Sequence, residues 1–195
     1  MLRTVAIANY FIDRSLEPPG RALYASSLTA LLYFAHGWWL GANNQPLLDA
    51  RFVAGTDGPE IPRLNRMLRM FDTNPVNKRL TLFLDAAAGN GKSAWTTPAL
   101  EGADPAAPVL DQVWKALGGE SVYLLHDLLT QPYTPWAAIW HGSSSSRKPN
   151  EVVEVDDERI RRWFVARREG GTSPLDAVLA AIKNKPLSRA GGDLV

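Results

Sequence analysis

The clearest chemical motif in the sequence is AAAGNGKS, at 86–93, which follows the apolar segment 80–85. A phosphate-binding P-loop also ends in Gly-Lys-Ser, because its backbone N–H groups and its lysine hold phosphate oxygens. That motif needs an earlier glycine at the position that Ala86 occupies, and it must open a helix. The following residues, SAWTTPALEGADP, contain too much proline and glycine for a sustained helix. We therefore expect a loop here, and keep as an alternative a nucleotide-binding enzyme that uses Gly91, Lys92 and Ser93.

The other side chains that could do chemistry do not form a recognisable constellation. His36, His126 and His141 each lack a second metal ligand three or four residues away on the same helix. The absence of cysteine excludes thiolate zinc sites, cysteine nucleophiles and disulfide frameworks. No G-x-S-x-G motif is present, and the acids at 156–158 are typical of a first helical turn. We predict no catalytic residues, no metal and no cofactor, and hence a protein that is not an enzyme.

Basic residues form a stripe in which Arg63, Arg66 and Arg69 lie three apart on one expected helix. A solvated helix face is the first interpretation, an acidic protein partner the second and nucleic acid the third. The net charge of +1, from 21 basic and 20 acidic residues, argues against a nucleic-acid partner. A second basic stretch, Arg159–Arg168, leaves nucleic-acid binding as a further alternative.

The seven tryptophans are more than a core of this size needs. Trp38, Trp114 and Trp163 fall on apolar stripes and are expected in the core. Trp136 and Trp140 follow a proline-rich turn without clear periodicity, so that a contact surface and core packing are equally good interpretations. The residues that we take as candidates for binding a partner are Tyr33, His36, Trp39, Trp136, Trp140, Arg63 and Arg66.

The elements around these residues predict a mainly α (α+β) fold, a compact bundle of six or seven helices with one or two short β-strands. Apolar residues recur at helical spacing in most of the chain, and Thr4, Ser121 and Asp156 or Asp157 are expected N-caps. The expected helices cover 4–16, 26–43, 62–71, 109–117, 122–129, 158–168 and 174–182, and the expected extended segments lie at 52–53, 80–85 and 152–155.

A chain of 195 residues is long enough for one domain of ordinary size. We expect that domain at 1–169, with 86–108 as an irregular loop insertion, and a C-terminal helix and flexible tail at 170–195. No uncharged apolar run reaches the roughly 20 residues of a membrane span, so we expect no membrane contact. The absence of cysteine favours a cytoplasmic protein.

Several sequence blocks occur in an order that resembles the Panacea antitoxin domain, the family of the SocA-type antitoxin and the phage-associated GepA-like proteins. The blocks are IANYFID (7–13), LLYFAHGWWL (31–40), QPLLDARFVAGTDGPEIPRL (45–64), LDQVWKALGGESVYLLHDLLTQPYTPWAAIW (110–140) and VDDERIRRWF (155–164). The chain departs from the family pattern at Ala30, where a lysine is usual, at 55–57, where Gly-Thr-Asp replaces Trp-Lys-Tyr, and at 129–130, where Leu-Thr replaces Thr-His.

The resemblance covers about residues 5–165 and implies a bacterial or phage antitoxin that neutralises a cognate toxin by direct protein–protein binding. In the SocA-type case the antitoxin is also a proteolytic adaptor that delivers its toxin to the ClpXP protease. The partners implied are therefore a toxin protein and, as an open second route, ClpXP.

Overall fold

The computed structural model describes residues 1–85, 93–142 and 152–168. Within these ranges seven α-helices hold about half of the residues, and short antiparallel strands form two small sheets. The mainly α (α+β) class is confirmed, but five strands are present where one or two were expected. None of the helices in these ranges combines the length and the apolar character needed to cross a membrane. The helix expected at 174–182 lies outside the described residues.

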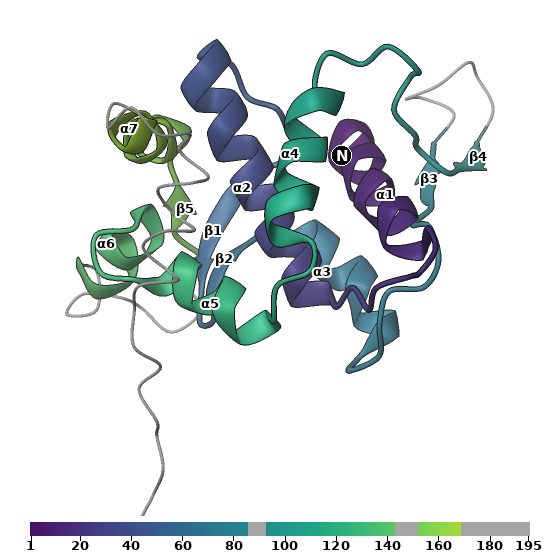
Figure 1. Cartoon of the computed structure of the whole chain (residues 1–195), viewed down its shortest axis with the longest axis horizontal. Helices are drawn as coiled ribbons and strands as arrows, with labels where there is room; N and C mark the ends of the chain where they lie inside the picture. The colour runs from purple at the N-terminus through teal and green to yellow at the C-terminus, as the bar shows by residue number, and fades with distance from the viewer. Residues whose placement is uncertain (86–92, 143–151, 169–195) are drawn as a thin grey trace, which may run out of the picture.

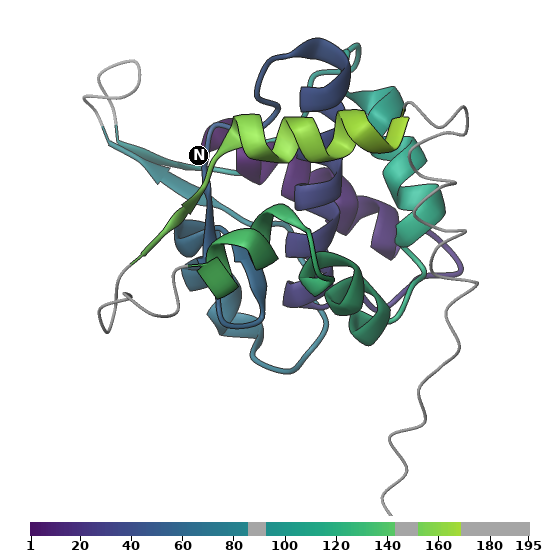
Figure 2. The same ribbon diagram turned by 90° about the vertical axis from the view of Figure 1, so that its left-hand side faces the viewer.

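Helix α2 (Ala25–Asn43) is the central element. It packs against α1 (Leu2–Leu16), α4 (Ala107–Leu117), α5 (Val122–Thr130) and α7 (Asp157–Arg168), which surround it in both views (Figures 1 and 2). Its sequence is apolar almost all round, and Leu28, Leu31, Leu32 and Phe34 are completely or almost completely buried. This is the expected behaviour of a helix with no polar face.

Asp49, in the loop after α2, caps the first helix from a distance. Its carboxylate accepts hydrogen bonds from the backbone N–H groups of Arg3 and Thr4 (3.2 and 2.9 Å) and from the Thr4 hydroxyl (2.6 Å). Thr4 was expected to be the N-cap, but α1 begins at Leu2 and Thr4 lies inside its first turn. The correction has a simple cause: a carboxylate distant in sequence satisfies the first N–H groups, so no local cap is needed.

Local signals predicted several other helix starts correctly. Pro62 lies in the first turn of α3 (Pro62–Leu68), which continues as a 3-10 turn over Arg69–Phe71. The Ser121 hydroxyl accepts from the Leu124 N–H at 3.2 Å and caps α5, and Asp156 accepts from the Arg159 N–H at 3.2 Å at the start of α7. Helix α6 (Pro135–Gly142) was not predicted. This segment of eight residues is too short and too uniformly apolar to show helical periodicity.

The first sheet has the strand order β2-β1-β5, with β1 at Phe52–Gly55, β2 at Gly58–Glu60 and β5 at Glu154–Val155. Both pairings are antiparallel, and Phe52 faces Val155 across the β1–β5 pair. Gly58, at a φ of 125°, allows the tight β1–β2 turn. The sheet therefore ties the segment after α2 to the start of α7.

The second sheet is a hairpin of β3 (Leu82–Leu84) and β4 (Ala94–Thr96), which projects from the helices (Figure 2). The expected irregular loop at 86–108 is therefore wrong at β4 and at 107–108, where α4 has already begun. Strand β4 forms because it pairs with β3, and the rings of Phe83 and Trp95 meet at 5.4 Å across the pair.

Candidate functional site

A groove opens at the N-terminal end of α2, with α3 and α5 as its walls and β2 at one end. We call it the α3–α5 groove. Its volume is about 980 Å³. The α2 residues at its floor are Ala25, Ser26, Thr29 and Ala30, and the apolar side chains of its walls include Leu68, Val122, Leu125 and Leu129.

Arginines dominate the α3 wall of this groove. Arg63, Arg66 and Arg69 are all exposed, and Arg66 and Arg69 line the groove directly. None of the three forms an ion pair with another residue in the part of the chain that the structure describes. Among the described residues, the guanidinium groups of these three arginines are therefore outside any ion pair.

The rest of the lining is mixed in character. Asp57, Glu60 and Asp72 contribute carboxylates, of which Glu60 accepts a hydrogen bond from the Asn65 side chain at 3.2 Å. The α5 wall carries Tyr123, whose side chain is 85% exposed. An apolar floor, a basic wall and an exposed aromatic ring can together bind an amphipathic segment of another molecule.

The seven candidate residues are not brought together by the fold. Arg66 lines the groove and Arg63 lies on the same helix, but none of the other five lines it. Trp39 is half-buried and lies about 14 Å farther along the α2 axis than Ala30, at 1.5 Å per residue. Of the seven candidates for binding a partner, only Arg63 and Arg66 on α3 therefore lie at the groove or on its wall helix.

His36 and Tyr33 are buried, which contradicts their selection as partner contacts. His36 has no exposed surface: its Nδ1 accepts from the Leu48 N–H at 3.3 Å, and its Nε2 lies 3.0 Å from a carboxylate oxygen of Asp157. It joins α2, the following loop and the start of α7. Tyr33 is 2% exposed and packs edge-on against Phe52. Both side chains serve the core.

Trp136 is likewise a core residue. It is 5% exposed, its Nε1–H donates to the Gly55 carbonyl at 2.8 Å, and its ring stacks on that of Trp140 at 5.5 Å. A partner cannot reach it while the fold is intact. Trp140 is half-buried on the same helix, α6, away from the groove. The aromatic surface expected around residue 136 is therefore mostly internal packing.

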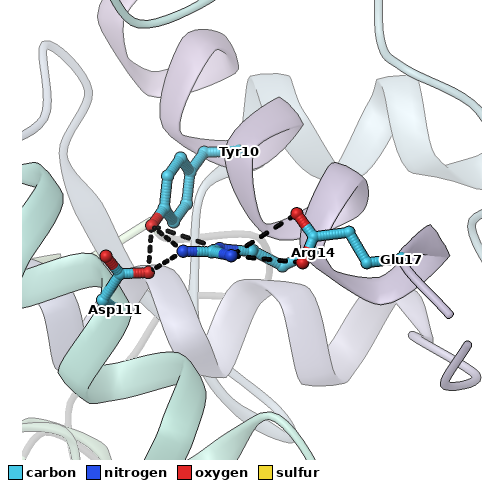
Figure 3. A network of polar contacts seen from close by, with 4 residues as sticks. All are labelled: Tyr10, Arg14, Glu17 and Asp111. Carbon is cyan, nitrogen blue, oxygen red and sulfur yellow. Dashed lines mark hydrogen bonds and ion pairs between the residues drawn. The ribbon is translucent and has the colours of Figure 1, made fainter. Parts of the chain in front are cut away.

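A cluster of polar side chains joins α1 to α4. Asp111 accepts from the Tyr10 hydroxyl at 2.5 Å and from Arg14, whose guanidinium also contacts Tyr10 and Glu17 (Figure 3). Burial raises the pKa of Tyr10, and its hydrogen bond to Asp111 raises it further. The contacts of Tyr10 and Arg14 with Asp111 tie α1 to α4. No group of three metal-ligating side chains occurs within residues 1–85, 93–142 and 152–168.

The structure also bears on the two alternative sites, which are the nucleotide-binding loop at 91–93 and the basic stretch of α7. Gly91 and Lys92 lie outside the described residues, but Ser93 leads into strand β4, whereas a P-loop serine opens a helix. In the basic stretch of α7, Arg161 and Arg162 bind Glu158 at 2.6 and 2.8 Å. Their charge is thus partly neutralised, and the side chains of 167–168 lie outside the described set.

The sequence analysis missed several exposed aromatic residues, among them Tyr123, Trp95 and Tyr133. Tyr123 and Trp95 expose 85% and 71% of their surface. The signal for Tyr123 was present, because it falls on the polar side of α5 with Asp127, opposite the buried Leu125 and Leu128. Trp95 lies in a segment that was expected to be an irregular loop. The sequence therefore gave no basis for predicting whether its side chain is buried or exposed.

No family model, curated protein or solved structure matches this chain. The basis for a functional proposal is therefore the α3–α5 groove, together with the ordered sequence blocks.

Proposed function

We propose that this protein is the antitoxin of a toxin–antitoxin system and neutralises a cognate toxin by direct protein–protein binding. The observation that carries the proposal is the α3–α5 groove, whose arginines are exposed and are not engaged in ion pairs within the described chain. Charged groups that a fold does not use, beside an apolar floor, are the usual components of a recognition surface.

The resemblance to the Panacea domain supports the antitoxin role through its ordered sequence blocks. Of the six positions at which this chain departs from the family pattern, Ala30, Asp57 and Leu129 line the groove, whereas Gly55, Thr56 and Thr130 do not.

The proposal places the protein in the cytoplasm of a bacterium or of a phage-infected bacterium. Delivery of the bound toxin to the ClpXP protease is a second step that binding permits. Its measurement is the half-life of the toxin in cells with and without ClpX: a shorter half-life that needs both this protein and ClpX supports delivery, and an unchanged one leaves neutralisation by occlusion alone.

Co-expression with the product of the neighbouring gene tests the main proposal. We expect that product to arrest growth when expressed alone, and this protein to restore growth and to co-purify with it. A variant that is destabilised in the core, Trp136→Ala, serves as the control for loss of folded protein. Failure of the intact protein both to restore growth and to co-purify contradicts the proposal.

A further inference from the structure

We propose that the α3–α5 groove binds an acidic, amphipathic segment of a partner protein. Carboxylates of that segment pair with Arg63, Arg66 and Arg69, and its apolar side chains enter the groove between α3 and α5. The inference rests on the proposed function only in taking the toxin as the natural source of the segment.

The first step is to see which arginines the fold pairs with acidic side chains. Arg3 binds both carboxylate oxygens of Asp104 at 2.9 and 3.0 Å, and Arg79 binds both of Asp13 at 2.7 Å. Most other arginines with described side chains are also paired with an acid: Arg14, Arg51, Arg161 and Arg162. The α3 stripe is the cluster left without such partners in the described chain, and a planar guanidinium is well suited to bind a carboxylate from outside.

The second step is spacing. Arg63, Arg66 and Arg69 extend over about 9 Å of helix, at 1.5 Å per residue. Arg63 and Arg66 lie on α3, and Arg69 begins the 3-10 turn that continues it. Carboxylates that recur every three or four residues on a partner helix would meet these guanidiniums in turn.

The third step is the apolar part of the groove walls. Leu68, Leu125 and Leu129 are 2–7% exposed and line the groove. Tyr123, on the opposite side of α5 from Leu125, also lines the groove with 85% of its surface exposed, and an exposed tyrosine is a favoured interface anchor. The volume of about 980 Å³ lies at the upper end of the roughly 300–1,000 Å³ of small-molecule pockets, which suits several side chains of a segment.

The fourth step distinguishes a protein from a nucleic acid. Asp57 and Asp72 lie at the groove together with Glu60, so that carboxylates there outnumber the lining arginines. A polyanion with a charge at every phosphate would meet these carboxylates as well as the arginines. A peptide can place its acids against α3 alone and present apolar or basic residues elsewhere.

Two binding partners test the proposal with the full chain. The first is a fluorescent synthetic helical peptide of about 20 residues, longer than the ~12–15 that an isolated helix needs. It carries glutamates at i, i+3 and i+7 beside a leucine stripe, and a second peptide has glutamine in place of each glutamate. The second partner is the product of the neighbouring gene. The variants are the triple R63E/R66E/R69E, Tyr123→Ala, and the double R21E/R159E as a matched control of exposed arginines outside the groove.

We expect the glutamate peptide to bind at least tenfold more tightly than the glutamine peptide. The triple variant should lose at least tenfold in affinity for the glutamate peptide and for the toxin, with a weaker salt dependence, while the control retains both. Melting temperatures should stay unchanged, because all five arginines are exposed. Tyr123→Ala should weaken binding without unfolding the protein.

Equal affinity for the two peptides, or unchanged binding by the triple variant, overturns the proposal. Binding of a single-stranded oligonucleotide that the triple variant abolishes, without selective binding of the glutamate peptide, also overturns it and assigns the stripe to nucleic acid. Selective binding of the glutamate peptide without any binding of the toxin supports the groove and rejects the antitoxin function. Toxin binding that the triple substitution leaves unchanged supports the antitoxin function and rejects the groove as the binding site.

Discussion

Asp49 joins the loop after α2 to the first turn of α1. Burial by itself raises the pKa of this carboxyl group, but hydrogen bonds from the terminal ammonium group, the Thr4 hydroxyl and the backbone N–H groups of Thr4 and Arg3 outweigh burial. The result is a pKa lowered to about 2. The ionised carboxylate therefore stabilises the folded state.

We predict that Asp49→Asn lowers the free energy of unfolding at neutral pH. The substitution should also make that free energy depend less on pH in the acidic range. Because the folded pKa is below the unfolded one, the stabilisation is complete above about pH 4 and is lost as the pH falls toward 2. Urea titrations of both proteins across this interval measure it. The difference between them should shrink with falling pH; a constant difference would mean that the charge of Asp49 is not the cause.

A second prediction concerns the two stacked tryptophans. Trp136→Ala should destabilise the protein by about 3–5 kcal/mol, because it removes a buried ring and leaves the Gly55 carbonyl without its donor. Trp140→Ala should cost less, since Trp140 is only half-buried. Trp136→Phe keeps most of the ring and separates the hydrogen bond from packing. Chemical denaturation measures all three, and equal losses for the two alanine variants would contradict the assigned burial.

Single residues show how far the sequence could predict the site. Arg63 and Arg66 were found because their spacing is local. The burial of His36 depends on Asp157, which is 121 residues away, and that of Trp136 on a carbonyl 81 residues away. A helical pattern carries no information on such partners, and so an aromatic or histidine side chain could not be assigned to core or surface.

At the scale of elements, Gly37 determines how closely α2 and α7 approach. A methyl group added to Gly37 would overlap the ring of Phe164, whereas one added to Gly41 would lie 3.6 Å from the Cβ of Phe164, an ordinary contact. Phe164 is itself almost completely buried and lies against the rings of Phe34 and Trp38. The ring therefore has little room to move away.

We predict that Gly37→Ala lowers the free energy of unfolding by about 1–3 kcal/mol, as expected for overpacking. Gly41→Ala, the matched control on the same helix, should be neutral or stabilising, because alanine favours helix by up to about 1 kcal/mol over glycine. Urea denaturation followed by circular dichroism compares them. A stable Gly37→Ala protein would show that α7 can shift on α2 at little cost.

The elements that the sequence predicted are those whose signals are local. Pro62 and Ser121 mark helix starts through their own backbone geometry and hydroxyl group. Helix α6 and strand β4 were missed because α6 depends on packing and β4 on its pairing with β3. The prediction that Thr4 caps α1 was wrong for the same reason, because the carboxylate that accepts from the first N–H groups of the helix belongs to Asp49.

At the scale of the whole molecule, ion pairs between distant segments bind the surface elements to one another. Arg3 pairs with Asp104 and Arg79 with Asp13, across 101 and 66 residues of sequence. These pairs surround α1, whereas α2 is held by apolar packing on nearly every side. High salt should therefore loosen the periphery before it affects the centre.

The same arrangement predicts an order of local opening. The amides of α2 should exchange with deuterated solvent most slowly, because they open only when the helices around α2 separate. The β3–β4 hairpin should exchange much faster, since it has two short strands, and Phe83 and Trp95 are largely exposed. Hydrogen exchange read by mass spectrometry resolves the two regions. Added urea should accelerate exchange in α2 strongly and in the hairpin only weakly, because opening of the hairpin exposes little buried surface. Equal protection and an equal urea response in both regions would mean that the hairpin unfolds only together with the helical core.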